Sequence, residues 1–270
     1  MSDTLKKRIV TAVVLALALL LILLGLPPLA TVVALSVIVL LGAWEWSAFL
    51  RLPDFAARLG YVVLIGATLA GAWWLSRRAD SHNLVLLVAL LWWLVALLWV
   101  ATAPRRVTRL SAGAAGVLAL VPAWVALVRL RLTVPDGDQW VLFALLLVWM
   151  ADIGAYFVGR RFGRLRLAPT VSPAKTWEGV LGGVLLSSVC AIAGSAWFRL
   201  PLGTFLPLCL AAVGFSIVGD LTESLLKRFA GVKDSGTVFP GHGGVMDRFD
   251  SITGAIPVLV LGLTLLGVVP

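Results

Sequence analysis

The feature that most constrains this chain is a series of nine apolar segments, each long enough to cross a lipid bilayer. A transmembrane helix needs about 20 mostly apolar residues. Lipid offers no hydrogen-bond partners, so a spanning segment must satisfy its own backbone, and these segments lack the alternation of barrel strands. We therefore predict an all-α, polytopic integral membrane protein with about nine transmembrane helices. The predicted spans are residues 9–26, 29–50, 59–76, 84–101, 111–129, 140–158, 177–198, 204–226 and 250–269.

The composition leaves no room for a large soluble domain. Hydrophobic residues make up 61% of the 270 positions and charged residues 13%, against about 25% charged residues in soluble domains. The net charge is +9, but the basic residues lie in short loops between spans, so we expect no nucleic-acid partner. Cys190 and Cys209 lie in apolar runs, and we expect packing roles for them rather than a disulfide or a metal site.

The distribution of Lys and Arg predicts how the chain is oriented in the membrane. If the N-terminus is inside the cell, 17 of the 22 Lys and Arg residues fall in inside segments and five in outside segments. Cytoplasmic loops are enriched in Lys and Arg, so this orientation is favoured. It places two polar loops, residues 159–176 and 227–249, on the cytoplasmic side, where nucleotides are found.

The chain divides into two parts at about residue 135. Residues 1–135 contain no chemical motif, and we interpret them as transmembrane helices that form a scaffold and could supply the contacts of a homodimer. Residues 136–270 hold both polar loops and are expected to carry the chemistry. Glu45 is the exception in the first part, and we expect it either to form an ion pair or to contact a lipid headgroup. Glycines that suit close helix packing recur at Gly113, Gly116, Gly179, Gly182 and Gly183.

Carboxylates near the ends of the last spans indicate a cation site. An acid inside a span costs roughly 2.5–3.5 kcal/mol on insertion scales, so a group of such acids indicates a function. Asp220, Glu223 and Lys227 share one helical face with Ser224, and Glu223 can pair with Lys227 four residues on. Oxygen ligands without Cys or several His favour Mg²⁺ over Zn²⁺. The candidate metal ligands are Asp152, Asp220, Glu223, Asp247 and Asp250.

A second polar block precedes the seventh predicted span. Ser172 and Pro173 predict a helix start, with Ser as the N-cap and Pro at the first helical position. A helix N-terminus beside Lys175 suits a phosphate group, although a capped helix with a solvated lysine would give the same pattern. Farther on, residues 240–244 predict a tight turn, without the spacing of a Walker loop.

Two segments carry most of these residues. One runs from Ser224-Leu-Leu-Lys227-Arg228 through Lys233-Asp234-Ser-Gly236 to Phe239-Pro240-Gly-His242-Gly243-Gly244-Val-Met-Asp247-Arg248-Phe-Asp250, and the other is Ser172-Pro173-Ala-Lys175-Thr-Trp-Glu178-Gly179. The first resembles the signature of the phosphatidate cytidylyltransferases, also called CDP-diacylglycerol synthases, with no departure from it. The second is similar to an upstream motif of that family. The resemblance covers roughly residues 150–251, and the N-terminal half matches only in having several spans.

The resemblance implies a reaction in which CTP and phosphatidic acid give CDP-diacylglycerol and pyrophosphate. The lipid phosphate would attack the α-phosphorus of CTP directly, so no protein nucleophile is required. It implies an active site on the cytoplasmic face of a bacterial inner membrane, where Mg²⁺, with room for a second cation, bridges triphosphate oxygens from Asp220 and Asp247. The implied catalytic residues are Lys175, Asp220, Lys227, Arg228, Asp247 and Arg248. The implied substrate-binding residues are Ser172, Ser224, Lys233, Asp234, His242, Gly243 and Gly244.

Two other functions compete with this interpretation. An ion-coupled transporter could use Asp152, Asp220 and Glu223 as a relay inside the membrane, but it would not need a dense basic loop with a glycine turn on one side. Another lipid phosphotransferase, of the CDP-alcohol type, would carry an Asp-Gly pair followed by Ala-Arg. Asp136-Gly137 is not followed by that pair.

Overall fold

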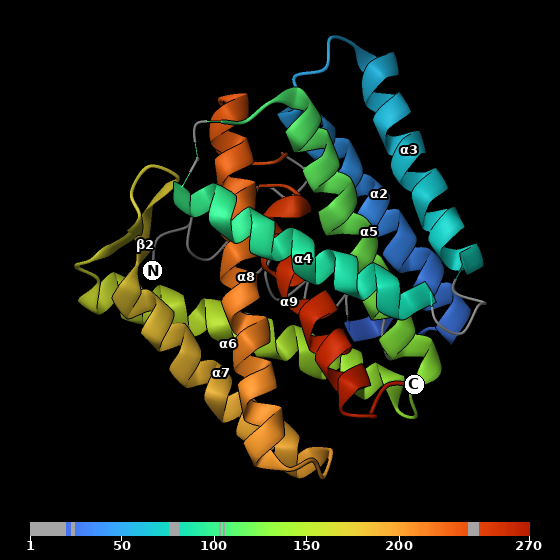
Figure 1. Ribbon diagram of the computed structural model, residues 1–270, viewed down its shortest axis with the longest axis vertical. Coiled ribbons are helices and arrows are strands. Elements are labelled where there is room, and N and C mark those ends of the chain that lie inside the picture. Colours follow the sequence, from blue (N-terminus) through green and yellow to red (C-terminus); the bar gives the residue numbers. More distant parts are fainter. Residues whose placement is uncertain (1–19, 23–24, 76–80, 103, 105, 237–242) are drawn as a thin grey trace.

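Eight long helices and one short β-hairpin make up the part of the chain that the computed structural model describes (Figure 1). That part is the whole chain except residues 1–19, 23–24, 76–80, 103, 105 and 237–242. All eight helices are long and apolar enough to cross a membrane. The elements are α2 (Pro28–Phe49), α3 (Phe55–Leu75), α4 (Ser81–Thr102), α5 (Arg109–Thr133), α6 (Gly137–Phe162), β1 (Arg166–Ala168), β2 (Ser172–Thr176), α7 (Trp177–Trp197), α8 (Leu202–Ala230) and α9 (Met246–Leu265).

The predicted all-α membrane architecture is confirmed. Eight of the nine predicted spans coincide with helices to within a few residues, and the first, 9–26, lies mostly outside the described residues. The largest differences are at polar helix ends, because α8 continues to Ala230 and α9 begins at Met246. Hydropathy marks where a helix is apolar, whereas the backbone stays helical until a cap ends it. Gly231 is such a cap, in the left-handed conformation with φ 77°.

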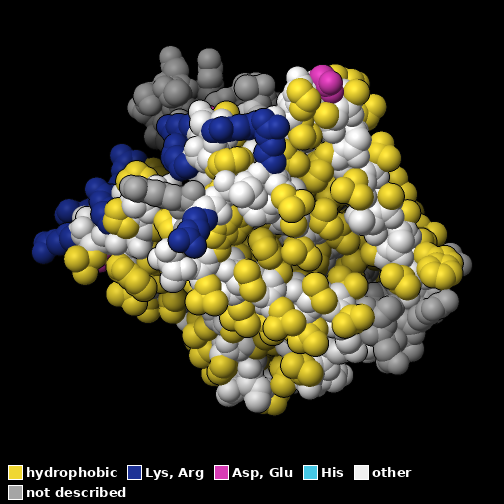
Figure 2. All heavy atoms as spheres, turned by 45° about the horizontal axis from the view of Figure 1, so that its top comes forward, with side chains coloured by type: hydrophobic (Ala, Val, Ile, Leu, Met, Phe, Trp, Pro, Cys, Tyr) yellow, Lys and Arg dark blue, Asp and Glu magenta, His cyan; other side chains and the backbone are white. Residues whose placement is uncertain are grey.

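The outer faces of α3 and α4 present large hydrophobic side chains. Val63, Leu64, Leu84, Leu91 and Leu98 are all at least 50% exposed. In Figure 2, hydrophobic side chains cover most of the visible face, while Lys and Arg side chains gather toward one end of it. Such extensive apolar exposure suits contact with lipid rather than water, and the chain is an integral membrane protein.

Glycines bring the C-terminal helices into backbone contact. A Cβ on Gly154 of α6 would collide with the carbonyl oxygen of Gly182 on α7. A Cβ on Gly219 of α8 would lie 3.3 Å from the amide nitrogen of Gly254 on α9 and 3.4 Å from the carbonyl carbon of Asp250. The close packing predicted at Gly182 is therefore confirmed, and the same device joins α8 to α9.

The N-terminal helices are tied together by side-chain hydrogen bonds across helix crossings. The indole nitrogen of Trp46 on α2 donates to the carbonyl oxygen of Ala112 on α5 at 2.9 Å. The Tyr61 hydroxyl on α3 donates to the carbonyl oxygen of Gly113 at 3.0 Å. A Cβ on Gly116 would lie 2.6 Å from the Trp46 indole nitrogen, which confirms the close packing predicted there.

Neither cysteine forms a disulfide, as predicted from their apolar surroundings. Cys209 is buried and Cys190 is half-buried, and both are free thiols. Their role in the described structure is packing.

The prediction that Ser172 and Pro173 begin a helix is wrong. Ser172–Thr176 is strand β2, which pairs antiparallel with β1, Ala168 opposite Ser172. The helix begins at Trp177, and its N-cap is Thr176, whose hydroxyl accepts from the Gly179 amide at 3.2 Å. Proline fixes φ near a value that an edge strand tolerates as well as a first helical turn does, so the Ser-Pro pair was ambiguous.

The glycine contact between α6 and α7 predicts a selective loss of stability. Gly154→Ala should lower the melting temperature in detergent by several degrees, because its new methyl group meets rigid backbone, and overpacking of this kind costs about 1–3 kcal/mol. Gly71→Ala in α3 is the matched control, since a Cβ there meets no atom within 4 Å. It should leave the melting temperature unchanged or raise it slightly. Equal melting temperatures for the two variants would contradict the backbone contact.

Candidate active site

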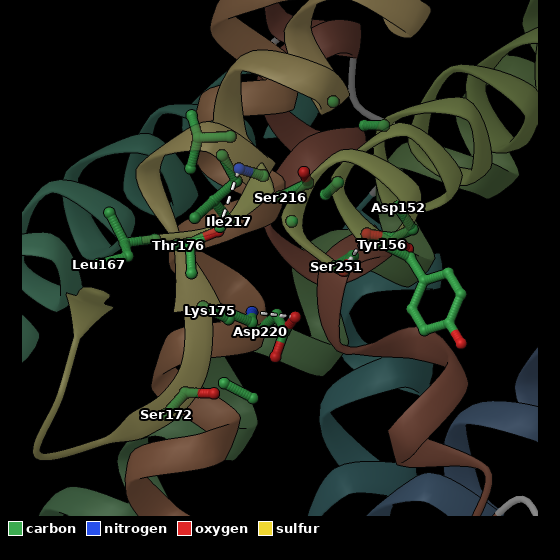
Figure 3. A pocket seen from close by; sticks show the side chains of 18 of the residues that line it. Asp152, Tyr156, Leu167, Ser172, Lys175, Thr176, Ser216, Ile217, Asp220 and Ser251 are labelled. Carbon is green, nitrogen blue, oxygen red and sulfur yellow. Dashed lines mark hydrogen bonds and ion pairs between the residues drawn. The ribbon is translucent and has the colours of Figure 1, made fainter. Parts of the chain in front are cut away.

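A cavity of about 760 Å³ lies between α6, α7, α8, the start of α9 and the β-hairpin. Figure 3 shows that its polar side chains come from both sides, with β2 and α8 facing α6 and α9. The lining reaches from the first turns of α7 and α9 to the middle of α6 and α8, where Asp152 and Ser216 lie. The polar lining residues are Asp152, Tyr156, Arg160, Arg166, Ser172, Lys175, Thr176, Ser216, Asp220, Asp247, Arg248, Asp250 and Ser251.

Lys175 and Asp220 form an ion pair across the cavity. Lys175 points from β2 toward Asp220 on α8 (Figure 3), and the ammonium and carboxylate are in contact. Each side chain is 26% exposed, so the pair is accessible from the cavity. The hydroxyl of Ser224, one helical turn on, lies 3.4 Å from the other Asp220 oxygen. The structure thus brings Lys175 to the acidic cluster, from a strand rather than from a helix start.

Lys227 of α8 contacts two carboxylates, one on its own helix and one on α9. Its Nζ lies 2.8 Å from Asp247 Oδ1 and 3.2 Å from Glu223 Oε1. The predicted pairing of Glu223 with Lys227 is confirmed. Glu223 is only 1% exposed, and neither of its oxygens accepts a hydrogen bond from the described residues. The charge of Lys227 therefore offsets the cost of burying the Glu223 carboxylate.

Asp247 is held by four protein donors. Lys227 donates to Oδ1, and Oδ2 accepts from the Gly244 amide at 2.8 Å and from the amide and hydroxyl of Ser235, both at 2.9 Å. Gly243 adopts a left-handed φ of 78°, and a Cβ there would collide with the Asp247 carboxylate. Glycine at position 243 therefore permits both the turn and the approach of the carboxylate.

Asp152 and Asp250 approach the cavity from α6 and α9. The Ser251 hydroxyl lies 3.4 Å from Asp152 Oδ1, and the Ser251 amide donates to Asp250 Oδ1 at 2.7 Å. Because Gly219 contacts the backbone of Asp250, the next residue, Asp220, is near Asp250 where α8 and α9 cross. Asp220, Asp247 and Asp250, all candidate metal ligands, line this one cavity, and each of the first two is paired with its own lysine.

The cavity carboxylates differ in how many acceptor sites the protein leaves open. A carboxylate offers about four lone-pair sites. Three of the four donors to Asp247 converge on Oδ2, so only Oδ1 keeps a site open, whereas one or two described donors each reach Asp152, Asp220 and Asp250. Within the described ranges, no three His, Cys, Asp or Glu side chains form a metal cluster. An incomplete set of oxygen donors fits Mg²⁺, which proteins usually hold through one or two carboxylates with substrate phosphates completing the shell.

The other residues predicted for the site are more dispersed. Arg248 and Ser172 line the cavity. Arg228 instead faces the hairpin, its Nε 3.4 Å from the Val171 carbonyl oxygen. Lys233 and Asp234 are exposed. His242 lies outside the described residues.

Glu45 and Ser235 belong to this network but were not predicted for it. Glu45 of α2 is 4% exposed and accepts from the backbone amides of Val245 and Met246 and from the Ser235 hydroxyl. Both expectations for Glu45 are therefore wrong, because its partners in the described structure are uncharged donors, and burial excludes a headgroup contact. The sequence did indicate a buried contact, because Glu45 is the one acid in the apolar span 29–50 and such an acid needs a partner. No local pattern indicated that the partner lies 190 residues away.

Sequence comparison agrees with this geometry over nearly the whole chain. Residues 6–266 match the profile of the cytidylyltransferase family. A phosphatidate cytidylyltransferase of Pseudomonas aeruginosa is 41% identical over 231 residues, which is 83% of this chain and 84% of the relative. One from Haemophilus influenzae is 38% identical over 277 residues, 94% of this chain and 96% of the relative. One from Staphylococcus saprophyticus is 33% identical over 213 residues, 78% of this chain and 79% of the relative.

These matches extend well beyond the polar motifs and include the N-terminal helices. Several relatives exceed 30% identity over more than two thirds of both chains. The chain belongs to the cytidylyltransferase family and is a nucleotidyltransferase embedded in a membrane.

Proposed function

We propose that the protein transfers a cytidylyl group from CTP to phosphatidic acid, which gives CDP-diacylglycerol and pyrophosphate. The observation that carries this proposal is the cavity of about 760 Å³, in which lysine, arginine and carboxylate side chains meet between membrane-spanning helices. The names of the relatives support the same substrates. The match to an enzyme family removes the ion-coupled transporter as an alternative.

The reaction needs no protein nucleophile. An ionised oxygen of the lipid phosphate attacks the α-phosphorus of CTP and forms the new P–O bond. The bond from the α-phosphorus to the oxygen bridging to the β-phosphate breaks, and pyrophosphate leaves with that electron pair. The protein contributes alignment of the reactants and stabilisation of charge on the oxygens around phosphorus.

Among the described residues, four cations line the cavity: Arg160, Arg166, Lys175 and Arg248. Lys175 and Arg248 are the two best placed to contact phosphate. Lys175 meets the cavity acid Asp220, and Arg248 lies between the cavity acids Asp247 and Asp250 in the chain. Lys175 can exchange its pairing with Asp220 for a substrate phosphate. Lys227 acts differently, since it is only 9% exposed and bonded to Asp247. We assign it to holding Asp247 and α9 in place.

We further propose that Asp220 and Asp250 hold a Mg²⁺ ion, with Asp152 nearby. These acids keep acceptor sites open and share the cavity. A bound Mg²⁺ would neutralise charge on the triphosphate and orient it. Asp247, which receives more protein donors than the other cavity acids, would shape the site from beside it.

We also propose that the cavity faces the cytoplasm of a bacterial cell, at the inner membrane. CTP is a cytoplasmic nucleotide, and Lys and Arg concentrate at the cavity end of the molecule. The start of α9 lies at the cavity, and the helix then crosses to the opposite end, where Figure 1 places the C-terminus.

This orientation predicts the position of the C-terminus. A reporter that is active only in the cytoplasm, fused after Pro270, should be silent, because α9 carries the chain away from the cavity side. The same reporter inserted between Pro169 and Thr170, at the tip of the hairpin, should be active if the insertion is tolerated. The reverse pattern would place the cavity on the other side of the membrane.

The proposed reaction and metal site predict the behaviour of two acid variants. Purified protein in detergent should convert labelled CTP and phosphatidic acid to a labelled lipid when Mg²⁺ is present. Asp220→Asn and Asp247→Asn should each reduce turnover about 100-fold or more, because the first removes charge from a proposed metal ligand and the second removes a partner of the buried Lys227 that shapes the site. Asp220→Asn should also raise the Mg²⁺ concentration needed for half-maximal rate. Asp138→Asn, outside the cavity lining, is the control. An Asp220→Asn variant with wild-type rate and Mg²⁺ dependence would contradict the metal assignment.

Lys175 should matter for turnover more than for folding. Lys175→Ala should lose most activity, because a cation facing the substrate phosphate is removed, and Lys175→Arg should recover part of it. The melting temperature should change little, because the pair with Asp220 is partly exposed and such pairs contribute modestly to stability. Arg106→Ala removes an exposed cation that does not line the cavity and should stay active. Full activity of Lys175→Ala would reduce Lys175 to a structural residue.

A further inference from the structure

The carboxylate of Glu45 caps the start of a helix that is 200 residues away in the sequence. Glu45 Oε1 accepts from the Val245 amide at 3.0 Å, and Oε2 accepts from the Met246 amide at 2.9 Å. These amides lie at the N-cap and the first residue of α9. Amides at a helix start have no partner within the helix, and a negative charge there is favourable. Glu45 thus supplies from α2 the cap that α9 lacks locally.

The Ser235 hydroxyl couples Glu45 to Asp247. Its oxygen lies 2.9 Å from Glu45 Oε2 and 2.9 Å from Asp247 Oδ2. A hydroxyl has a single proton to donate, so the two carboxylates share one donor. The position of Asp247 at the cavity therefore depends on where Glu45 lies.

The neighbours of Glu45 along α2 are hydrogen-bonded to α3 and α5. Trp46 is bonded to Ala112 of α5, and Arg58 of α3 donates to the Trp44 carbonyl oxygen at 3.0 Å and to the Ser47 hydroxyl at 2.8 Å. The scaffold helices fix the residues on both sides of Glu45. Its carboxylate therefore has a defined place against which the loop can settle.

The loop leaves room for this carboxylate by having no side chain there. A Cβ on Gly236 would lie 2.8 Å from the Glu45 carboxyl carbon. A Cβ on Gly244 would collide with both Glu45 oxygens. Two glycines from opposite ends of the loop thus surround one buried acid.

We propose that Glu45 is a positioning residue for the active site, which holds the first turn of α9 and, through Ser235, the carboxylate of Asp247. Glu45 does not line the cavity and is assigned no contact with substrate. The link to turnover rests on the proposed function, in which Asp247 shapes the cytidylyl-transfer site, whereas the link to α9 rests on the contacts alone.

Glu45→Gln, in the full-length protein, separates these two links. Glutamine has the same shape, but its NH₂ group must face at least one of the donors that now bind the carboxylate. Hydrogen exchange of the peptide covering residues 243–250, measured by mass spectrometry without CTP or metal, should become faster by about tenfold or more, as expected from the loss of a bond to a charged group. Exchange in residues 177–197 should not change.

Steady-state kinetics should show that Glu45→Gln also slows turnover. The kcat should fall about tenfold or more, while the KM for CTP should stay within about threefold, because Glu45 is not at the cavity. Ser235→Ala should give the same pattern, and the double variant should fall no further than the more impaired single variant. If Glu45→Gln does not fold, Ser235→Ala alone carries the test.

The matched control is Asp54→Asn. Asp54 also accepts a backbone amide, from Ala57 at 2.8 Å, but it is exposed and away from the cavity. It should leave exchange in 243–250 and kcat unchanged. Unchanged exchange in Glu45→Gln would overturn the cap, and faster exchange with wild-type kcat would overturn the positioning role. If the wild-type protein transfers no cytidylyl group, the proposed function fails, while the exchange data still decide whether Glu45 holds α9.

Discussion

The cavity end of the molecule depends on a buried lysine that neutralises two acids at once. Lys227 is only 9% exposed and lies between Glu223 on its own helix and Asp247 on the next. Removing one partner of such a group leaves an uncompensated buried charge, which is strongly destabilising. This charge balance therefore fixes α8 relative to α9. It works together with the backbone contact at Gly219, which brings the two helices close enough for the lysine to bridge them.

Three acids near this end have donors that differ with their surroundings. Asp220, which faces the cavity, is paired with the partly exposed Lys175. Asp247 combines a lysine with backbone amides and a hydroxyl. Glu45, which is buried beside the scaffold helices, accepts only from uncharged donors among the described residues. The cost of placing carboxylates in membrane helices is thus offset locally.

Hydropathy was sufficient to place the helices because the thickness of a bilayer sets a length that can be counted along one chain. The pairing of Glu223 with Lys227 was also predictable, since helical geometry makes residues four apart neighbours. The hairpin was missed because Ser172-Pro173 suits either a first helical turn or an edge strand, and only the pairing with residues 166–168 distinguishes them. The N-cap of α7 is Thr176. Threonine is a weaker N-cap residue than serine, so the sequence favoured Ser172.

Residue types and their order along the chain were enough to predict a bundle of membrane helices, the residues that share one face of α8, and motifs that resemble a cytidylyltransferase. Those properties depend on residues close together in the chain or on the order of residue types. The tertiary structure alone decided that Lys175 meets Asp220, that Lys227 meets Asp247, and that Glu45 meets the start of α9. These partners come from segments far apart in sequence, and their meeting depends on how closely the helices pack. That closeness is set by small residues at crossings such as Gly219 against Asp250, where it follows from three-dimensional fit rather than from any pattern along the chain.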